Sequence, residues 1–254
     1  MFSLPLFKQS IKSNGVFLLV ITAILTLLNV EFAIINDTKP MLFVIFYGMM
    51  TLIVPSIYVL VTSNSLVSNQ VDRGSMAYIL SNPVKRSAVV FTQASYFVLS
   101  LAGMFLVNTL AALGANSQSE YNLSMAQQAA HGATGYLTTE MIIQLNFSCF
   151  AVTLALAGIT FMFSSIFNLS KYAMAFSGTV IGVSILAKIM SLFGTMGIKA
   201  MSNFKYLTFG SLFDVSSILQ GKNDWVVLTI VALLISFVGF VIGSVWFAKK
   251  DLPL

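Results

Sequence analysis

Six long apolar runs divide the chain, and polar segments separate them. About 20 consecutive apolar residues cross the hydrocarbon core of a bilayer as a helix, and each run reaches that length. The pattern predicts an all-α membrane protein in which residues 1–254 form a single transmembrane domain. The predicted spans are Val16–Ile35, Met41–Thr62, Ala88–Leu110, Met141–Phe163, Ala173–Phe193 and Trp225–Phe247.

The segment before the first span has a different pattern. Leu4, Phe7 and Ile11 recur at helical spacing, and Lys8 and Lys12 lie between them. An apolar face beside basic residues is typical of a short helix that lies along a membrane surface. We therefore expect an N-terminal interfacial helix ahead of the six spans.

Two long segments follow the third and fifth spans. Gly114–Glu140 is rich in Gln, Ala and Ser and is expected to be partly helical, whereas Gly194–Asp224 alternates apolar and polar residues. A surface loop as apolar as the second segment would be costly in water. We expect it to fold back into the outer leaflet as short amphipathic re-entrant helices, where protein covers its backbone. Its apolar residues are Met201, Phe204, Leu207, Phe209, Leu212, Phe213, Val215, Ile218 and Leu219.

Composition and charge fix the environment and the orientation. The chain is 57% hydrophobic and 8% charged, with a mean hydropathy of +0.91, whereas soluble domains carry about 25% charged residues. The net charge of +5 gives no reason to expect nucleic acid as a partner, because the basic residues are scattered. Eight of the 13 lie on the side of the termini and four opposite, so both termini are predicted to be cytoplasmic. The eight are Lys8, Lys12, Arg73, Lys85, Arg86, Lys171, Lys249 and Lys250; the four are Lys39, Lys199, Lys205 and Lys222.

No catalytic or metal-binding pattern is found in the sequence. Cys149 is the only cysteine and His131 the only histidine, so neither an internal disulfide nor a metal cluster is expected. A phosphate-binding loop of the G-x-x-x-x-G-K-[ST] type is absent, since the GKND stretch at Gly221 lacks the upstream glycine. The chain is therefore expected to bind no cofactor itself, and any ATP-driven work requires energy from a partner.

Two charged residues fall inside predicted spans, and each has two interpretations. Glu31 in the first span and Lys188 in the fifth lie towards the outer ends, where side chains can reach the membrane surface. Alternatively, they pair across helices or line a substrate path. No span contains the series of mid-membrane carboxylates expected of a proton-driven carrier, which disfavours a secondary transporter.

Two glycine pairs at four-residue spacing allow helices to approach closely. They are Gly178 and Gly182 in the fifth span, and Gly239 and Gly243 in the sixth. Packing within one subunit and contact with a second copy are both open for each pair.

The loop between the second and third spans, QVDRGSMAYILSNPVKR, is more elaborate than a simple turn. Ser75 can cap a helix start, the residues after it place one apolar face at helical spacing, and Pro83 ends the helix. An exposed apolar face with a charged rim is suited to docking into a groove on another protein. The alternative is an interfacial helix that rests on lipid. The apolar face consists of Met76, Ile79 and Leu80.

This loop resembles that of the ABC-2 type permeases, the membrane subunits of ATP-binding cassette exporters. Their loop follows E-[KR]-x-x-G-[ST]-x-x-x-L-L-[ST]-x-P-[VI]-x-R, and this chain has DRGS, then ILSNPVKR. It differs in having Asp72 in place of Glu and one residue fewer before the glycine. The final WFAKKDLPL is similar to the family's F-x-[KR]-[RK]-D-[LF] tail. The resemblance covers the whole chain in topology.

The resemblance implies that the loop is a cytoplasmic coupling helix held by a separate nucleotide-binding ATPase, which binds ATP and Mg²⁺. It also implies a second permease copy, identical or related, and favours Gly178 and Gly182 for the contact between copies. The residues expected to couple to the ATPase are Gln70, Asp72, Arg73, Gly74, Ser75, Met76, Ile79, Leu80, Pro83 and Arg86.

The expected substrate follows from the apolar spans and from the family. The chain has 22 Phe and 13 Met, which can line an adaptable apolar path, and no polar pocket is visible. We expect export of amphipathic or hydrophobic peptides or antibiotics, such as bacteriocins or phenol-soluble modulins, from a bacterial plasma membrane. A bias to Lys over Arg is typical of the low-GC Gram-positive bacteria that make such peptides. The alternatives are a membrane immunity or sensor protein that binds a peptide without moving it, and a gradient-driven carrier.

Overall fold

The computed structural model describes residues 2–36, 40–81, 85–122, 138–195 and 199–250. Within them all regular structure is helical, and six helices are long and apolar enough to cross a membrane, as the hydropathy pattern predicts. The long helices are α1 (Leu4–Asn36), α2 (Pro40–Leu66), α5 (Arg86–Asn122), α7 (Thr139–Ile166), α8 (Ser170–Thr195) and α10 (Asp224–Lys249). The short ones are α3 (Ser68–Asp72), α4 (Ser75–Ser81), η1 (Lys199–Leu207), η2 (Phe209–Leu212) and α9 (Val215–Leu219).

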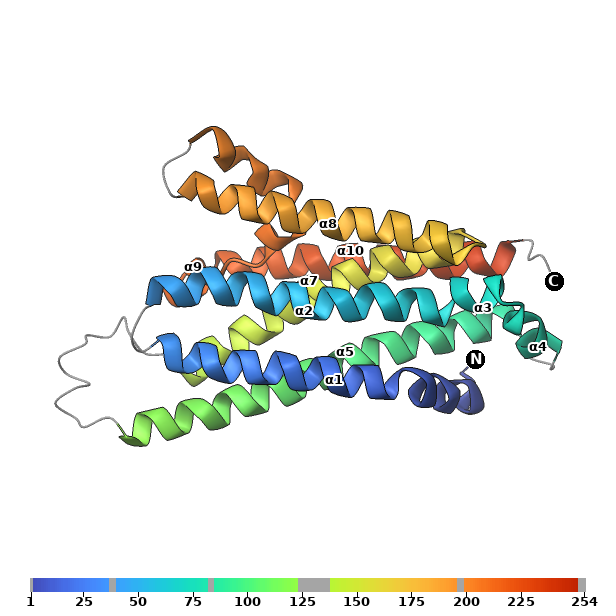
Figure 1. Ribbon diagram of the computed structural model, residues 1–254, viewed down its shortest axis with the longest axis horizontal. Helices are drawn as coiled ribbons and strands as arrows, with labels where there is room; N and C mark the ends of the chain where they lie inside the picture. Colours follow the sequence, from blue (N-terminus) through green and yellow to red (C-terminus); the bar gives the residue numbers. More distant parts are fainter. Residues whose placement is uncertain (1, 37–39, 82–84, 123–137, 196–198, 251–254) are drawn as a thin grey trace.

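The long helices form one bundle, in which α1 begins and α10 ends at the same end (Figure 1). We call this the inner end and the opposite one the outer end. The short helices α3 and α4 lie at the inner end, whereas η1, η2 and α9 lie towards the outer end beside α8 and α10 (Figure 1).

The expected N-terminal interfacial helix is the first part of α1 and is continuous with the first span. Figure 1 shows these first turns out of line with the rest of α1. Lys8 and Lys12 are exposed, while the ring of Phe7 packs edge-on against Tyr96 of α5 at 5.9 Å. The segment therefore lies against the inner end of α5.

The helix α7 lies at the centre of the bundle. It contacts α10, α2, α5 and α8, and 72% of its most apolar window is buried, against 28% for α1, α8 and α10. Its long run of small residues explains this position, because small side chains let several neighbours approach at once. Its buried small residues include Ala151, Ala155, Ala157, Gly158, Ser164 and Ser165.

The closest helix contact joins α7 to α10. A Cβ atom built on Gly239 would lie 2.6 Å from the backbone carbon of Gly158, and one built on Gly243 would lie 3.1 Å from the Cα of Met162. The pair Gly239 and Gly243 therefore packs within the subunit, which resolves one of the two alternatives. For Gly178 and Gly182, by contrast, no atom of the described chain lies within 4 Å of such a Cβ.

Three asparagines join three spans in the outer half of the bundle. Asn29 of α1 donates from Nδ2 to Oδ1 of Asn108 in α5 at 2.7 Å, and Asn108 donates in turn to Oδ1 of Asn146 in α7 at 2.6 Å. All three are buried, so no water or lipid headgroup competes for these bonds. We call this set the asparagine ladder; it ties α1, α5 and α7 together where packing alone gives little direction.

Replacing Asn108 with leucine is expected to destabilise the protein by about 2 kcal/mol, because it leaves Oδ1 of Asn146 buried without a donor and leaves Nδ2 of Asn29 with only the Leu25 carbonyl as acceptor. The measurement is the thermal unfolding of the detergent-solubilised protein. Combining it with Asn29→Leu should cost less than the sum of the two single changes, because the two residues share one bond. Strict additivity would contradict the ladder.

Candidate functional site

The second span continues into a small hairpin at the inner end, which we call the inner knob (residues 68–81). The chain leaves α2 at Val67 (φ −126°, ψ −72°), forms α3, and turns at Arg73 and Gly74 into α4. Gly74 has φ +72°, a left-handed conformation that favours glycine, so the turn explains the glycine of the loop motif. The Ser75 hydroxyl donates to the carbonyl of Gln70 at 3.1 Å and ties α4 back to α3.

The prediction that the short helix of the inner knob exposes an apolar face is wrong. Met76 is fully buried and Ile79 is 7% exposed, because α4 folds back and packs this face on its own chain. Helical spacing shows which side chains share a face, but it does not show whether another protein or the same chain covers that face. The side chain of Leu80 and all of Pro83 lie outside the described residues.

The exposed surface of the inner knob consists of polar residues and one aromatic ring. Tyr78 is 78% exposed, and the turn between α3 and α4 is exposed beside it. Tyrosine and arginine are the residue types that most often anchor protein interfaces. Of the residues expected to contact a partner, the exposed ones are Asp72, Arg73, Gly74 and Ser75.

A cluster of hydrogen bonds, which we call the inner node, fastens the knob to α7 and α8. The Asp72 carboxylate accepts from the backbone N–H of Ser170, the first residue of α8, at 3.2 Å. The Asn64 amide donates to the Ser170 hydroxyl at 2.8 Å, and the Ser68 hydroxyl donates to Asn64 Oδ1 at 2.6 Å. The Ser68 N–H donates to the Ser164 hydroxyl of α7 at 3.1 Å. A carboxylate at a helix N-terminus is also favoured by the helix dipole.

The two sequence motifs meet at the inner end. Arg86, the last residue of the loop motif and the first of α5, donates from Nη1 to the carbonyl of Lys250 at 2.9 Å. Lys250 belongs to the tail motif and donates from Nζ to the carbonyl of Ser165 at 3.1 Å. Gln70 accepts from Gln93 of α5 at 3.1 Å. Arg86 therefore holds the end of α10, and the knob is also bonded to α5.

At the outer end, η1, η2 and α9 form what we call the outer plug (residues 199–219). It folds back against α8, α10 and α7, as expected for re-entrant helices. Phe213, Val215 and Ile218 are buried, which explains the apolar pattern of the segment. Tyr206 and Leu207 at the end of η1 are exposed.

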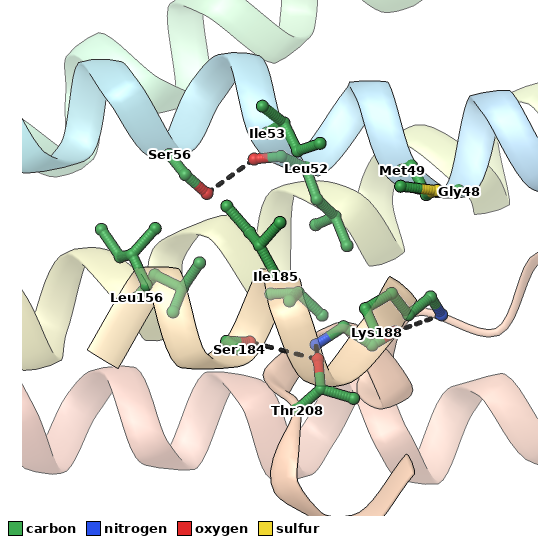
Figure 2. A pocket seen from close by; sticks show the side chains of 13 residues that line it. Gly48, Met49, Leu52, Ile53, Ser56, Leu156, Ser184, Ile185, Lys188 and Thr208 are labelled. Atoms are coloured by element: carbon green, nitrogen blue, oxygen red, sulfur yellow. Dashed lines mark hydrogen bonds between the residues drawn. The ribbon is translucent and has the colours of Figure 1, made fainter. Parts of the chain in front are cut away.

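Two side chains of α8 hold the plug (Figure 2). The hydroxyls of Ser184 and Thr208 are hydrogen-bonded at 3.1 Å, and the N–H of Phe209 donates to the Ser184 hydroxyl at 2.9 Å. Lys188 donates from Nζ to the carbonyl of Gly210 at 2.8 Å. Lys188 therefore bonds to the plug, whereas Glu31 is exposed on α1.

A carboxylate on the plug lies within electrostatic reach of Lys188. Burial alone would raise the pKa of Asp214, but hydrogen bonds from Ser216 and Ser217 and the positive charge of Lys188 outweigh it and hold the pKa below its ordinary value. The Ser216 and Ser217 hydroxyls donate at 2.6 and 2.7 Å, and the Ser217 N–H donates at 3.1 Å. Asp214 thus carries a negative charge that Lys188 helps to stabilise.

The space beside the plug is narrow. Between α2, α7, α8 and η2 it amounts to about 20 Å³, room for about one water molecule. Leu52, Ile53 and Ile185 line it together with the hydroxyls of Ser56 and Ser184 (Figure 2). The plug is therefore seated, and this region holds no chamber of substrate size in the conformation described.

Several residues of these contacts are not evident from the sequence pattern. Asn64 and Ser68 lie one helical turn apart at the end of the second span. A polar pair next to an apolar run can be detected in the sequence and indicates a polar contact. Ser184 and Thr208 carry no such signal, because serine and threonine are common in membrane helices.

Fold and site together define a helical polytopic membrane protein with an inner knob fastened to its spans and a seated outer plug. A family model described as ABC-2 family transporter protein matches residues 8–252. The chain belongs to this family. Its permeases are membrane subunits that lack the ATPase site and normally work with a partner ATPase. No curated protein matches the chain.

Proposed function

We propose that the chain is the permease subunit of an ATP-driven exporter in a bacterial plasma membrane, with both termini in the cytoplasm. Two permease copies, identical or related, pair with two ATPase subunits, which bind and hydrolyse ATP with Mg²⁺. The substrates are amphipathic or hydrophobic peptides or antibiotics, released on the outer side.

The observation that carries the proposal is the inner knob. It exposes Tyr78 and Arg73 at the inner end, while hydrogen bonds at the inner node fasten it to α8. A protruding element that is also bonded to a span can pass a push from a soluble partner into the membrane. An interfacial helix resting on lipid would instead turn its apolar face outward, and here Met76 and Ile79 of that face are buried.

Two observations support the remaining parts of the proposal. Gly178 and Gly182 face open space on α8, which leaves that face free for a second copy. In the six spans as the structure describes them, the carboxylates Glu31, Asp72, Glu140 and Asp224 are all exposed. A gradient-driven carrier requires a carboxylate inside the membrane that binds and releases a proton or cation. The hypothesis of an ATP-driven exporter is therefore favoured.

The test uses the wild-type protein and the ATPase encoded nearest to it. The chain alone should hydrolyse no ATP, and the co-expressed ATPase should purify with it. Inside-out vesicles containing both should accumulate an amphipathic peptide only with ATP. Accumulation driven by a proton or sodium gradient alone, or peptide binding without accumulation, would replace the proposal with a carrier or an immunity protein respectively.

A further inference from the structure

The helix α8 touches both functional regions. At the inner node its first residue, Ser170, donates from its backbone N–H to the Asp72 carboxylate and accepts from the Asn64 amide with its hydroxyl. About 27 Å further along the same helix, at a rise of about 1.5 Å per residue, Lys188 holds the outer plug. One continuous helix therefore has the knob bonded at one end and the plug at the other.

The packing of α8 allows it to move as a unit. Only 28% of its most apolar window is buried, against 72% for α7 and 61% for α2, so shifting α8 disrupts less packing than shifting either neighbour. Its buried residues form one narrow stripe, whose inward side faces α2 and α7. The stripe is Ala173, Ser177, Ile181, Ser184 and Ala187.

The bonds at the two ends are of different kinds. At the inner node α8 is held through its backbone N–H and a serine hydroxyl, both close to the exposed turn of the knob. At the outer end, Ser184 and Lys188 hold backbone and hydroxyl groups of the segment Thr208–Gly210, which closes the space beside α2. A shift of α8 along or away from α2 changes both sets of bonds together.

Resting on the proposed function, we propose that α8 is the lever that couples the ATPase to the outer gate. Movement of the inner knob displaces α8 through Asp72 and Ser170, and the displaced α8 unseats the plug by withdrawing Ser184 and Lys188 from Thr208 and Gly210. Asp72 and Lys188 are positioning residues, since they act through the helix and not on the substrate.

A reversible lock tests the outer end. The Ser184 and Thr208 oxygens are 3.1 Å apart, so cysteines at both positions place two sulfur atoms close to bonding distance. The variant S184C/T208C is made with Cys149→Ser, because Cys149 is the only native cysteine. Oxidation should lower ATP-driven peptide accumulation at least about tenfold, and dithiothreitol should restore it. The single variant S184C, treated identically, is the control.

The disulfide of the oxidised double variant is confirmed by mass spectrometry. If this variant accumulates peptide at the wild-type rate, the proposal that α8 is the lever is wrong. ATPase co-purification is measured on the same samples and should not change. If the ATPase does not co-purify with the wild-type permease, the proposed function is overturned. If oxidation of the double variant blocks transport whatever the energy source, the gate is still located at the plug.

The inner end has its own test. Asp72→Ala removes the acceptor for the Ser170 N–H, and Asp72→Asn keeps an acceptor oxygen while removing the charge. For the Asp72→Ala permease isolated together with its ATPase, the peptide moved per ATP hydrolysed should fall about tenfold. Asp72→Asn should restore most of this ratio, which a general loss of folding would not do. If the amount of peptide moved per ATP is unchanged in Asp72→Ala, the inner node does not transmit movement from the knob to α8.

Discussion

Replacing Gly239 with alanine is expected to lower the free energy of unfolding by about 2 kcal/mol, although alanine favours helix over glycine by about 1 kcal/mol. The added Cβ would lie 2.6 Å from the backbone carbon and 2.7 Å from the carbonyl oxygen of Gly158. Backbone atoms inside a helix cannot turn aside as a flexible side chain can, so α7 and α10 must separate. Both helices then lose contact along their shared length. The loss is measured as a lower unfolding temperature of the purified protein in detergent.

The matched control is Gly178→Ala on α8. No described atom lies within 4 Å of the added Cβ there, so this change should leave the stability of the isolated subunit unchanged or raise it by up to about 1 kcal/mol. If both variants unfold at the same temperature, the close contact between α7 and α10 is wrong.

Changing the exposed surface of the inner knob is expected to have the largest effect on activity. Arg73→Glu combined with Tyr78→Ala removes a cation and an aromatic ring that the described chain leaves exposed to a partner. Each such anchor contributes about 2 kcal/mol or more to an interface, so ATPase binding should weaken at least about a hundredfold. Co-purification of the ATPase and ATP-driven peptide accumulation should both be lost.

The outer plug offers a control of the same chemistry. Tyr206 is 79% exposed and lies beside the exposed Lys205, so Lys205→Glu with Tyr206→Ala makes an equivalent change at the opposite end. ATPase co-purification should survive it. If the ATPase co-purifies normally with the Arg73→Glu/Tyr78→Ala variant, the inner knob is not part of the interface with the ATPase. Met76→Asp is unsuitable for this purpose, because Met76 is buried and its loss would disturb the fold.

Much of the fold follows from the sequence because the bilayer imposes strong constraints. A span needs a long apolar run and a satisfied backbone, so hydropathy identifies the six helices. The glycine and the apolar run of the inner loop correctly indicate a turn followed by a short helix. The orientation of that helix could not be predicted, since burial of Met76 and Ile79 depends on how α4 folds back onto its own chain.

The candidate site was harder to predict. The inner node joins residues about 100 positions apart, such as Asn64 and Ser170, and no local pattern relates them. The asparagine ladder gave a signal that could have been used, because Asn29, Asn108 and Asn146 are amides inside apolar runs. These amides are uncharged, so they lack the signal that a charged residue inside a span gives. Buried amides in membrane helices need partners just as charged groups do, and each pairing brings two spans together.

The position of α10 has a consequence for biosynthesis. The most buried span of the described chain, α7, packs closely against α10, which is synthesised after it, and Arg86 holds the end of α10. Until α10 has been made, the surface around Gly158 faces lipid or a membrane chaperone. Truncation within α10 should therefore leave an open intermediate for quality-control proteases, however intact the five preceding spans are.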